Sequence, residues 1–150
     1  MTVHEEKAKQ LFCEGYNCAQ AVFAAFASEF GVDEKTAAKI ASSFGGGMGG
    51  TRSVCGAVSG MLMAAGLLFG YDDPQAKEEK RAHYADVALL LERFREENGS
   101  VICAELLGLG TVTKPIAPSD RTAEYYKKRP CAEMVACAAR LLDEFLQEKR

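Results

Sequence analysis

Residues 53–70 read SVCGAVSGMLMAAGLLFG, and the part from Val54 to Phe69 is the longest apolar stretch of the chain. It carries four small residues, Gly56, Ser59, Gly60 and Gly66. It is also shorter than the roughly 20 apolar residues that a membrane span requires. We therefore predict a buried helix over about residues 54–70, with Ser53 as its N-cap.

Helical spacing and capping residues account for most of the remaining chain. They predict helices at residues 2–13, 18–29, 34–43, 72–98, 101–107 and from 130 onward, with a helical turn at 122–127. Asp33 is expected to cap the helix at 34–43, and Gly99 to end the helix at 72–98. Pro74 is expected in the first turn of the long charged helix, and the glycine run at 45–50 is expected to be a loop without regular structure. The prediction is an all-α fold: a compact single domain over residues 1–150, with about six helices around the central apolar helix at about 54–70.

The charge and the N-terminus of the chain argue against several classes of partner. A net charge of −3 is unfavourable for nucleic acid, whose phosphates require a basic surface. The N-terminal residues are charged and lack the apolar core of a secretory signal, and no basic amphipathic segment indicates a membrane surface. We therefore expect a cytoplasmic protein, in which cysteines stay reduced and stable disulfides are disfavoured.

Four of the six cysteines occupy equivalent positions in the predicted helices. Each is expected in the first turn of a different helix: Cys18 after the N-cap Asn17, Cys55 after the N-cap Ser53, Cys103 after the N-cap Ser100, and Cys131 after Pro130 at the first helical position. Cys13 lies near a helix end and Cys137 in mid-helix, so burial without chemistry is the simpler interpretation for these two. Burial is also the simpler account of any one of the four, but their matching positions favour a shared site.

The first turn of a helix is a suitable place for a reactive thiol. Its unpaired backbone N–H groups and the positive end of the helix dipole favour the thiolate, which is the nucleophile and the metal ligand. A neighbouring arginine would add positive charge near Cys55, and small residues would let other backbone approach the sulfur. The residues expected to support the thiols in these ways are Arg52, Gly56, Gly60, Gly47 and Gly49.

The order of motifs along the chain resembles that of a known family. The chain carries, in order, GYNCAQAV at 15–22, the glycine run at 45–50, CGAVSG at 55–60, and two separate cysteines, Cys103 and Cys131. This arrangement resembles a family of redox-active proteins defined by four cysteines and a CGAxxG motif. The resemblance covers about residues 12–142 and implies a small bacterial or archaeal redox protein whose four cysteines are Cys18, Cys55, Cys103 and Cys131. The chain is also similar to a helical domain of certain multihaem cytochromes that contain an iron–sulfur centre, but it lacks Cys-x-x-Cys-His, so covalent haem is not expected.

Three functions remain open from the sequence. The first is an iron–sulfur cluster or a zinc ion held by the four thiolates for electron transfer, which would form only in the folded protein. The second is thiol–disulfide exchange by a close pair, for example Cys18 with Cys55. The third is a helical accessory module with structural cysteines and no cofactor. We rank the cluster or metal site first and expect the four sulfurs to converge on one site.

Other kinds of chemistry have no support in the sequence. The chain has no Ser–His–Asp arrangement, HExxH motif or paired-carboxylate pattern, so hydrolase functions are unsupported, and whether the protein is an enzyme stays open. A redox partner is expected, and neither nucleic acid nor a membrane is. The spacing of Gly56 and Gly60 suits close helix packing either within one chain or across a homodimer.

Overall fold

The computed structural model describes residues 1–149, excluding the side chains of residues 126–128. Its longer helices are α1 (Val3–Cys13), α2 (Cys18–Ala27), α3 (Glu34–Ala41), α5 (Gly56–Phe69), α6 (Lys77–Asn98) and α9 (Cys131–Lys149). The short helical turns α4 (Gly45–Met48), α7 (Cys103–Leu106) and α8 (Ala123–Lys128) lie between them. The described part of the chain contains no named strand, which confirms the predicted all-α fold.

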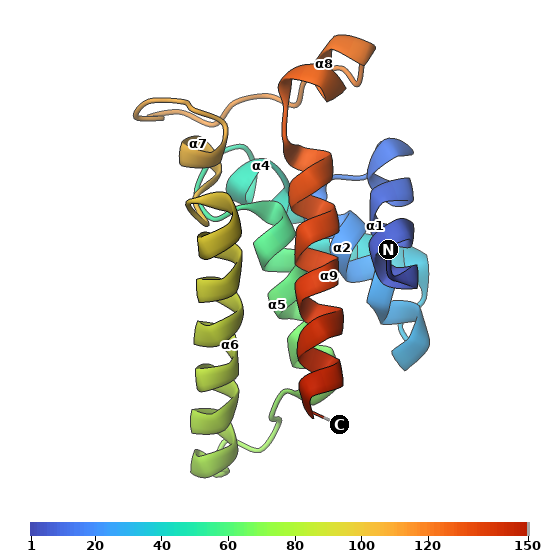
Figure 1. Cartoon of the computed structure of the whole chain (residues 1–150), viewed down its shortest axis with the longest axis vertical. Helices are drawn as coiled ribbons and strands as arrows, with labels where there is room; N and C mark the ends of the chain where they lie inside the picture. The colour runs from blue at the N-terminus through green and yellow to red at the C-terminus, as the bar shows by residue number, and fades with distance from the viewer. Residues whose placement is uncertain (150) are drawn as a thin grey trace.

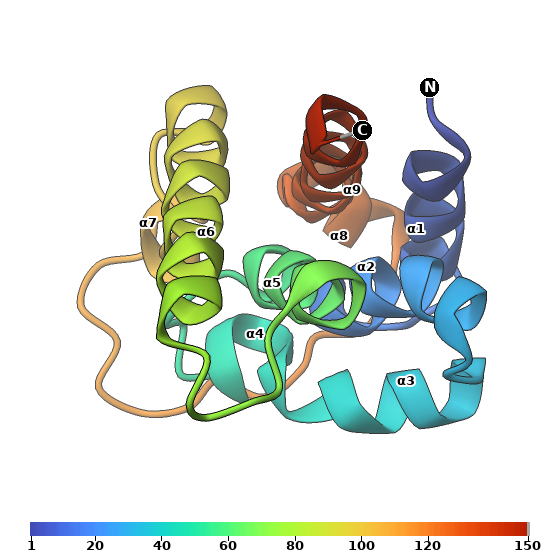
Figure 2. The same cartoon turned by 90° about the horizontal axis from the view of Figure 1, so that it is seen from below.

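The centre of the fold is formed by α5 together with α2. Eight of the ten residues of α2 are buried, and the first ten residues of α5 contain all eight of its buried residues. Viewed along the bundle, α5 lies between α6 and α2, with α9 packed across it (Figure 2). The apolar helix predicted at about 54–70 is therefore central, and the alanine-rich α2 shares that position with it.

Two glycines allow α5 to pack closely on α2. A Cβ atom at Gly60 would lie 2.7 Å from the backbone oxygen of Ala19 and 3.0 Å from the Cβ of Val22. A Cβ atom at Gly56 would lie 3.1 Å from the Cβ of Cys18. The Gly-x-x-x-Gly spacing therefore serves packing between two helices of the same chain.

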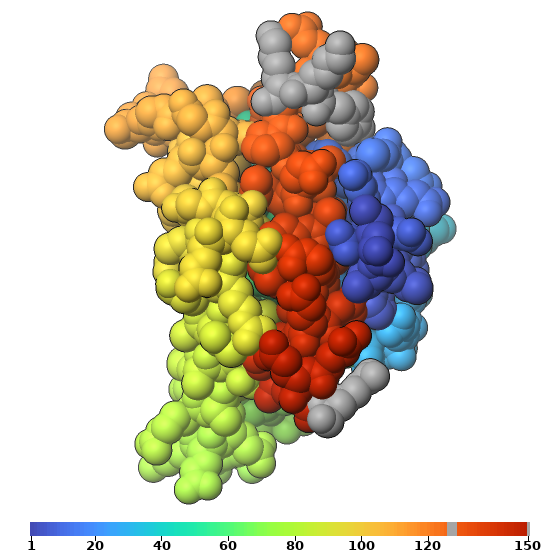
Figure 3. Space-filling model, viewed as in Figure 1, coloured from blue at the N-terminus to red at the C-terminus, as the bar shows by residue number. Residues whose placement is uncertain are grey.

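The short helices gather at one end of the molecule. In Figure 1, α6 and α9 run along the long axis, and α4, α7 and α8 lie together near the end where α9 begins. On the face drawn in Figure 3, the side chains of α6, α9 and α1 form the surface. None of the helices within residues 1–149 has both the length and the apolar character to cross a membrane.

Several helix starts differ from the predictions. The central helix begins at Gly56 rather than Val54, and α7 begins at Cys103 rather than Val101, because Val54 and Ile102 form an antiparallel β-bridge. Pro74 lies outside α6, which begins at Lys77 after a turn closed by the Ala76 N–H on the Asp73 carbonyl. A long-range bridge in the first case and a local turn in the second thus provide the backbone hydrogen bonds in place of the helical turn that the sequence predicts.

Candidate functional site

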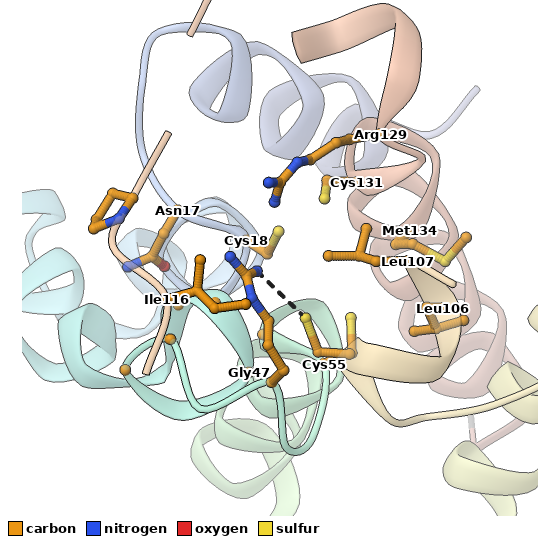
Figure 4. A pocket seen from close by; sticks show the side chains of 18 of the residues that line it. Asn17, Cys18, Gly47, Cys55, Leu106, Leu107, Ile116, Arg129, Cys131 and Met134 are labelled. Atoms are coloured by element: carbon orange, nitrogen blue, oxygen red, sulfur yellow. Dashed lines mark hydrogen bonds between the residues drawn. The ribbon is translucent and has the colours of Figure 1, made fainter. Parts of the chain in front are cut away.

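Four cysteines line one cavity of about 290 Å³ at the end of the bundle where the short helices gather. Cys18, Cys103 and Cys131 are the first residues of α2, α7 and α9, and Cys55 is the N-cap of α5. The side chains of Cys18, Cys55 and Cys131 point into the same cavity (Figure 4). The structure therefore places the N-terminal ends of four helices around one space, each with a cysteine at its start.

Cys55 and Cys103 are held side by side by a short backbone clamp. The Cys55 N–H donates to the Val101 carbonyl at 2.8 Å, and the Cys103 N–H donates to the Ser53 carbonyl at 2.6 Å. Ser53 and Ser100, which were predicted as N-caps, are therefore not caps: the structure gives these positions to Cys55 and Ile102. The clamp fixes two cysteines far apart in sequence.

Cys18 is positioned by the cap of α2. The Asn17 side chain accepts the Gln20 N–H at 2.9 Å, and the Gln20 side chain accepts the Asn17 N–H at 3.0 Å, which confirms the predicted cap. The Asn17 amide also donates to the Ser42 carbonyl at 3.2 Å, and the Gln20 amide donates to the Ala38 carbonyl at 3.0 Å. These bonds attach the start of α2 to α3 and to the turn that follows it.

Cys131 is brought to the cavity by the segment that leads into α9. Arg121 donates to the carbonyls of Phe12 and Tyr16, both at 2.9 Å, and its guanidinium lies over the Phe12 ring at 4.2 Å. Arg121 therefore connects this segment to the link between α1 and α2, next to Cys18. Pro130 precedes α9 and its carbonyl accepts the Met134 N–H, so Cys131 lies in the first turn as predicted.

The thiols of Cys18 and Cys131 form a hydrogen-bonded pair. This hydrogen bond, with burial, raises the pKa of Cys18 well above its ordinary value. The same hydrogen bond lowers the pKa of Cys131 to about 7, and Arg129 and Tyr125 contribute to the lowering. Cys131 therefore loses its proton first, and Cys18 keeps its proton to donate to the resulting thiolate.

For two of the four cysteines, the preference of a helix N-terminus for the thiolate is outweighed by other effects. Burial raises the pKa of Cys55 to about 11, and the backbone N–H groups of Val58 and Ala57 only partly oppose this shift. For Cys18, the hydrogen bond with Cys131 and burial raise the pKa and together outweigh any lowering by the start of the helix. The free energy of moving a thiolate out of water is larger here than its stabilisation by the first helical turn.

The cavity is lined by cations and thiols without acidic side chains. Its described lining includes Arg52, Arg121 and Arg129, and it contains no Asp, Glu, Lys or His. Arg52 donates from a terminal guanidinium nitrogen to the Sγ of Cys103 at 3.6 Å (Figure 4, dashed line). The sequence predicted that Arg52 would lie near Cys55. The antiparallel bridge instead brings Cys103 opposite Arg52. The Arg52 carbonyl accepts the Ala104 N–H, which holds the two segments together there.

The glycine run forms a left-handed turn beside Cys103. Gly46, Gly47, Met48 and Gly49 all have positive φ values, between 63° and 69°, so the loop has regular geometry where none was predicted. A Cβ atom at Gly47 would lie 2.6 Å from the Cβ of Cys103. Gly47, Gly49 and Gly56 line the cavity, whereas Gly60 does not and contacts α2 instead.

The other two cysteines lie outside the cavity lining. Cys13 is exposed at the end of α1. Cys137 is half-buried within α9, where its sulfur accepts a hydrogen bond from Asn98 at 3.4 Å. The sequence did not point to Arg121 or Arg129 as lining residues. Because Arg129 lies two residues before Cys131, the sequence could have indicated that it lies near this thiol. The position of Arg121 could not be predicted in this way, because it depends on contacts with α1.

The side chains as placed do not form a site for a single metal ion. Within the described part of the chain, no group of three or more Cys, His, Asp and Glu side chains is arranged to hold one. The four cysteines thus share a cavity without converging on one point.

Comparisons with known proteins agree with the position of the cysteines. A family model described as "Putative redox-active protein (C_GCAxxG_C_C)" matches residues 16–145, which include all four lining cysteines. Its label writes the motif GCAxxG, whereas in this chain Cys55 precedes Gly56. An uncharacterized protein of Archaeoglobus fulgidus is 27% identical over 159 aligned residues, which cover 97% of each chain. No solved structure gives a match.

Proposed function

This chain belongs to the family described as "Putative redox-active protein (C_GCAxxG_C_C)", and we propose that Cys18, Cys55, Cys103 and Cys131 together hold one iron–sulfur cluster. The observation that carries the proposal is that four helices begin at one cavity, each with a cysteine at its start. Cysteine thiolates are the usual ligands of such clusters. When bound, a cluster would supply one-electron transfer.

The cavity suits a cluster better than a single zinc ion. A structural zinc site requires four sulfurs at about 2.3 Å from one point, and the side chains as placed do not meet that requirement. Ligands spread around a cavity of about 290 Å³ can instead be bridged by a group with several metal atoms. Four thiolates around such a group carry net negative charge, and three arginines without an acidic neighbour in the lining offset it.

The protein's own groups have definable tasks in this proposal. The first turn of α5 directs the backbone N–H groups of Ala57 and Val58 toward the Cys55 sulfur, which would stabilise a thiolate ligand there once it forms. Leu106, Leu107, Ile116 and Met134 supply an apolar part of the cavity lining. A partly apolar, cationic lining with N–H donors is the kind of environment that tunes a cluster's reduction potential.

A second candidate is thiol–disulfide exchange by Cys131 and Cys18, because these two thiols are already in hydrogen-bond contact. The Cys131 thiolate would attack a disulfide of a partner, form a mixed disulfide and release one partner thiolate. Cys18 would then lose its proton, attack the Cys131 sulfur and release the second partner thiolate. Two electrons pass to the partner, and a Cys18–Cys131 disulfide remains. The pair differs from the predicted Cys18–Cys55 pair.

Anaerobic purification with iron, acid-labile sulfide and visible absorption measurements tests the cluster. We expect a coloured protein whose iron and sulfide are lost in single Cys→Ser variants at each of the four lining positions. Cys13→Ser and Cys137→Ser are the matched controls, because neither cysteine lines the cavity, and both should keep the cluster. A wild-type protein that stays colourless and free of iron and sulfide when prepared without oxygen would refute it.

The same variants separate the two candidates. Exchange requires only Cys18 and Cys131, so Cys55→Ser and Cys103→Ser would keep a titratable dithiol if exchange is the function. A cluster requires all four ligands. A colourless protein that forms a Cys18–Cys131 disulfide, identified by peptide mass spectrometry, supports exchange. A protein indifferent to all four substitutions would be an accessory module with structural cysteines.

A further inference from the structure

We infer that Arg52 is a positioning residue of the redox site, and that its buried guanidinium is the counter-charge for the anionic group bound at Cys103. The inference rests on the proposed cluster and adds a residue that controls its charge balance. Arg52 is only 6% exposed and lines the cavity. It is the one buried cation in the described core, whose only other buried polar residue is Ser59.

The backbone around Arg52 is held in an unusual conformation that aims its side chain. Its φ value of 62° lies in the left-handed region, which is sterically unfavourable for a non-glycine residue. Its N–H donates to the Gly46 carbonyl at 3.0 Å, and its carbonyl accepts the Ala104 N–H at 3.1 Å. The residue is thus fixed between the glycine turn and α7, with the side chain directed to Cys103.

The guanidinium of Arg52 lacks the partners that a buried cation requires. One terminal nitrogen donates to the Cys103 Sγ at 3.6 Å, while Nε is buried and has no hydrogen-bond partner among the described residues. Arg52 forms no ion pair within the described chain, and no carboxylate lines the cavity. An uncompensated buried charge is strongly unfavourable.

The other two arginines of the lining show the contrast. Arg121 donates to two backbone carbonyls, and Arg129 donates to the Ser119 hydroxyl at 3.3 Å and lies over the Tyr125 ring. These contacts attach loops to the fold. Arg52 instead directs its charge toward a ligand sulfur, and its balancing negative charge arrives with the bound group.

This assignment predicts opposite effects of Arg52 in the two states of the protein. Reduction adds one negative charge to the bound cluster, so a cation at a ligand sulfur favours the reduced form and raises the potential. Without the cluster, the same cation has no counter-charge. Replacing it with an apolar side chain of similar length should then leave the metal-free fold at least as stable.

The experiment compares Arg52→Met, Arg52→Lys and the surface control Arg81→Met, in which an exposed arginine of α6 is lost. Anaerobic redox titration of the cluster should show a potential lower by at least about 59 mV in Arg52→Met, which is a tenfold change in a one-electron equilibrium. Arg52→Lys should recover most of the shift, and Arg81→Met should match the wild type. Urea unfolding of the metal-free proteins should give Arg52→Met a midpoint no lower than that of the wild type.

Each outcome bears on the assignment. A folded Arg52→Met protein that has lost the cluster, together with an Arg52→Lys protein that keeps it, supports the assignment equally well. An unchanged potential in a fully loaded Arg52→Met protein overturns the role of Arg52 and leaves the cluster standing. A metal-free Arg52→Met protein that fails to fold makes Arg52 a structural residue and also overturns it. A wild-type protein without any cluster overturns both proposals.

Discussion

Replacing either of two glycines of α5 by alanine should have different effects on stability: a gain at Gly66, and no gain or a loss at Gly60. Gly60 and Gly66 both lie inside the same helix, Gly56–Phe69. A Cβ atom at Gly60 would meet the Ala19 carbonyl oxygen at 2.7 Å and the Val22 Cβ at 3.0 Å, whereas at Gly66 nothing lies within 4 Å. The pair isolates the effect of close packing between α5 and α2.

The expected size of the difference follows from two terms. Alanine is better than glycine in a helix interior by about 1 kcal/mol, and this gain applies equally to both positions. At Gly60 the added atom also forces two backbones apart, and such overpacking costs about 1–3 kcal/mol. Gly66→Ala should therefore be more stable than the wild type by about 1 kcal/mol, and Gly60→Ala should lie below Gly66→Ala by about 1–3 kcal/mol.

Urea unfolding of the reduced, metal-free protein, followed by far-UV circular dichroism, measures this difference. Metal-free samples are needed because a bound group would add its own stabilisation by mass action. Thermal unfolding gives a second measurement, since each kcal/mol shifts Tm by roughly 2–4 °C in a domain of this size. Equal free energies of unfolding for Gly60→Ala and Gly66→Ala would refute the claim that Gly60 is required for the α2–α5 contact.

Three further predictions concern the site. In the reduced, metal-free protein, the rate of Cys131 alkylation should have its midpoint near pH 7. Cys18→Ala should move that midpoint to higher pH, and peptide mass spectrometry measures both midpoints. An unchanged midpoint would contradict the interaction between the Cys18 and Cys131 thiols. Because the pKa of Cys131 in the folded protein lies below the ordinary thiol value of 9.0, this thiolate's contribution to stability is full above pH 9 and is lost as the pH falls through 7. Gly49→Ala should cost about 1–2 kcal/mol, since its φ value is positive. Gly47→Ala should cost about 1–3 kcal/mol more, because its Cβ would lie 2.6 Å from the Cβ of Cys103 and 2.7 Å from the Cα of Arg52. Since only Gly47→Ala presses on a proposed ligand cysteine, it alone should lose bound iron; equal iron contents would count against this. Asn17→Ala removes the cap of α2 and should cost about 1 kcal/mol in urea unfolding, and an unchanged midpoint would contradict the cap.

Features that depend on local sequence were the ones that could be predicted. The cap at Asn17 and the position of Cys18 follow from residues within one helical turn, and the structure has both. The same holds for Asp33 before α3 and Gly99 after α6. In each case the side chain or backbone freedom of one residue determines where a helix begins or ends.

Features that depend on distant contacts could not be predicted. The bridge between Val54 and Ile102 shifts the starts of two helices from their predicted positions. It also places Arg52 beside Cys103 rather than beside the predicted partner Cys55. Neither residue carries a local sign of this pairing. The pKa of Cys55 is likewise set by burial, which exists only after the helices have packed. Sequence patterns identify where the helices lie, while the tertiary fold moves some of their starts and determines what surrounds them.

The CGAxxG motif is a packing element as well as a source of one sulfur. Cys55 supplies the thiol and the N-cap of α5, and Gly56 leaves the room in which the Cβ of Cys18 approaches. Gly60, one turn later, admits the backbone of α2 at Ala19. The motif therefore sets the distance between Cys18 and Cys55 through the α2–α5 contact. A substitution that separates these helices should weaken the site without touching a cysteine. Gly60→Ala should therefore have a lower free energy of unfolding than Gly66→Ala and should also bind less iron.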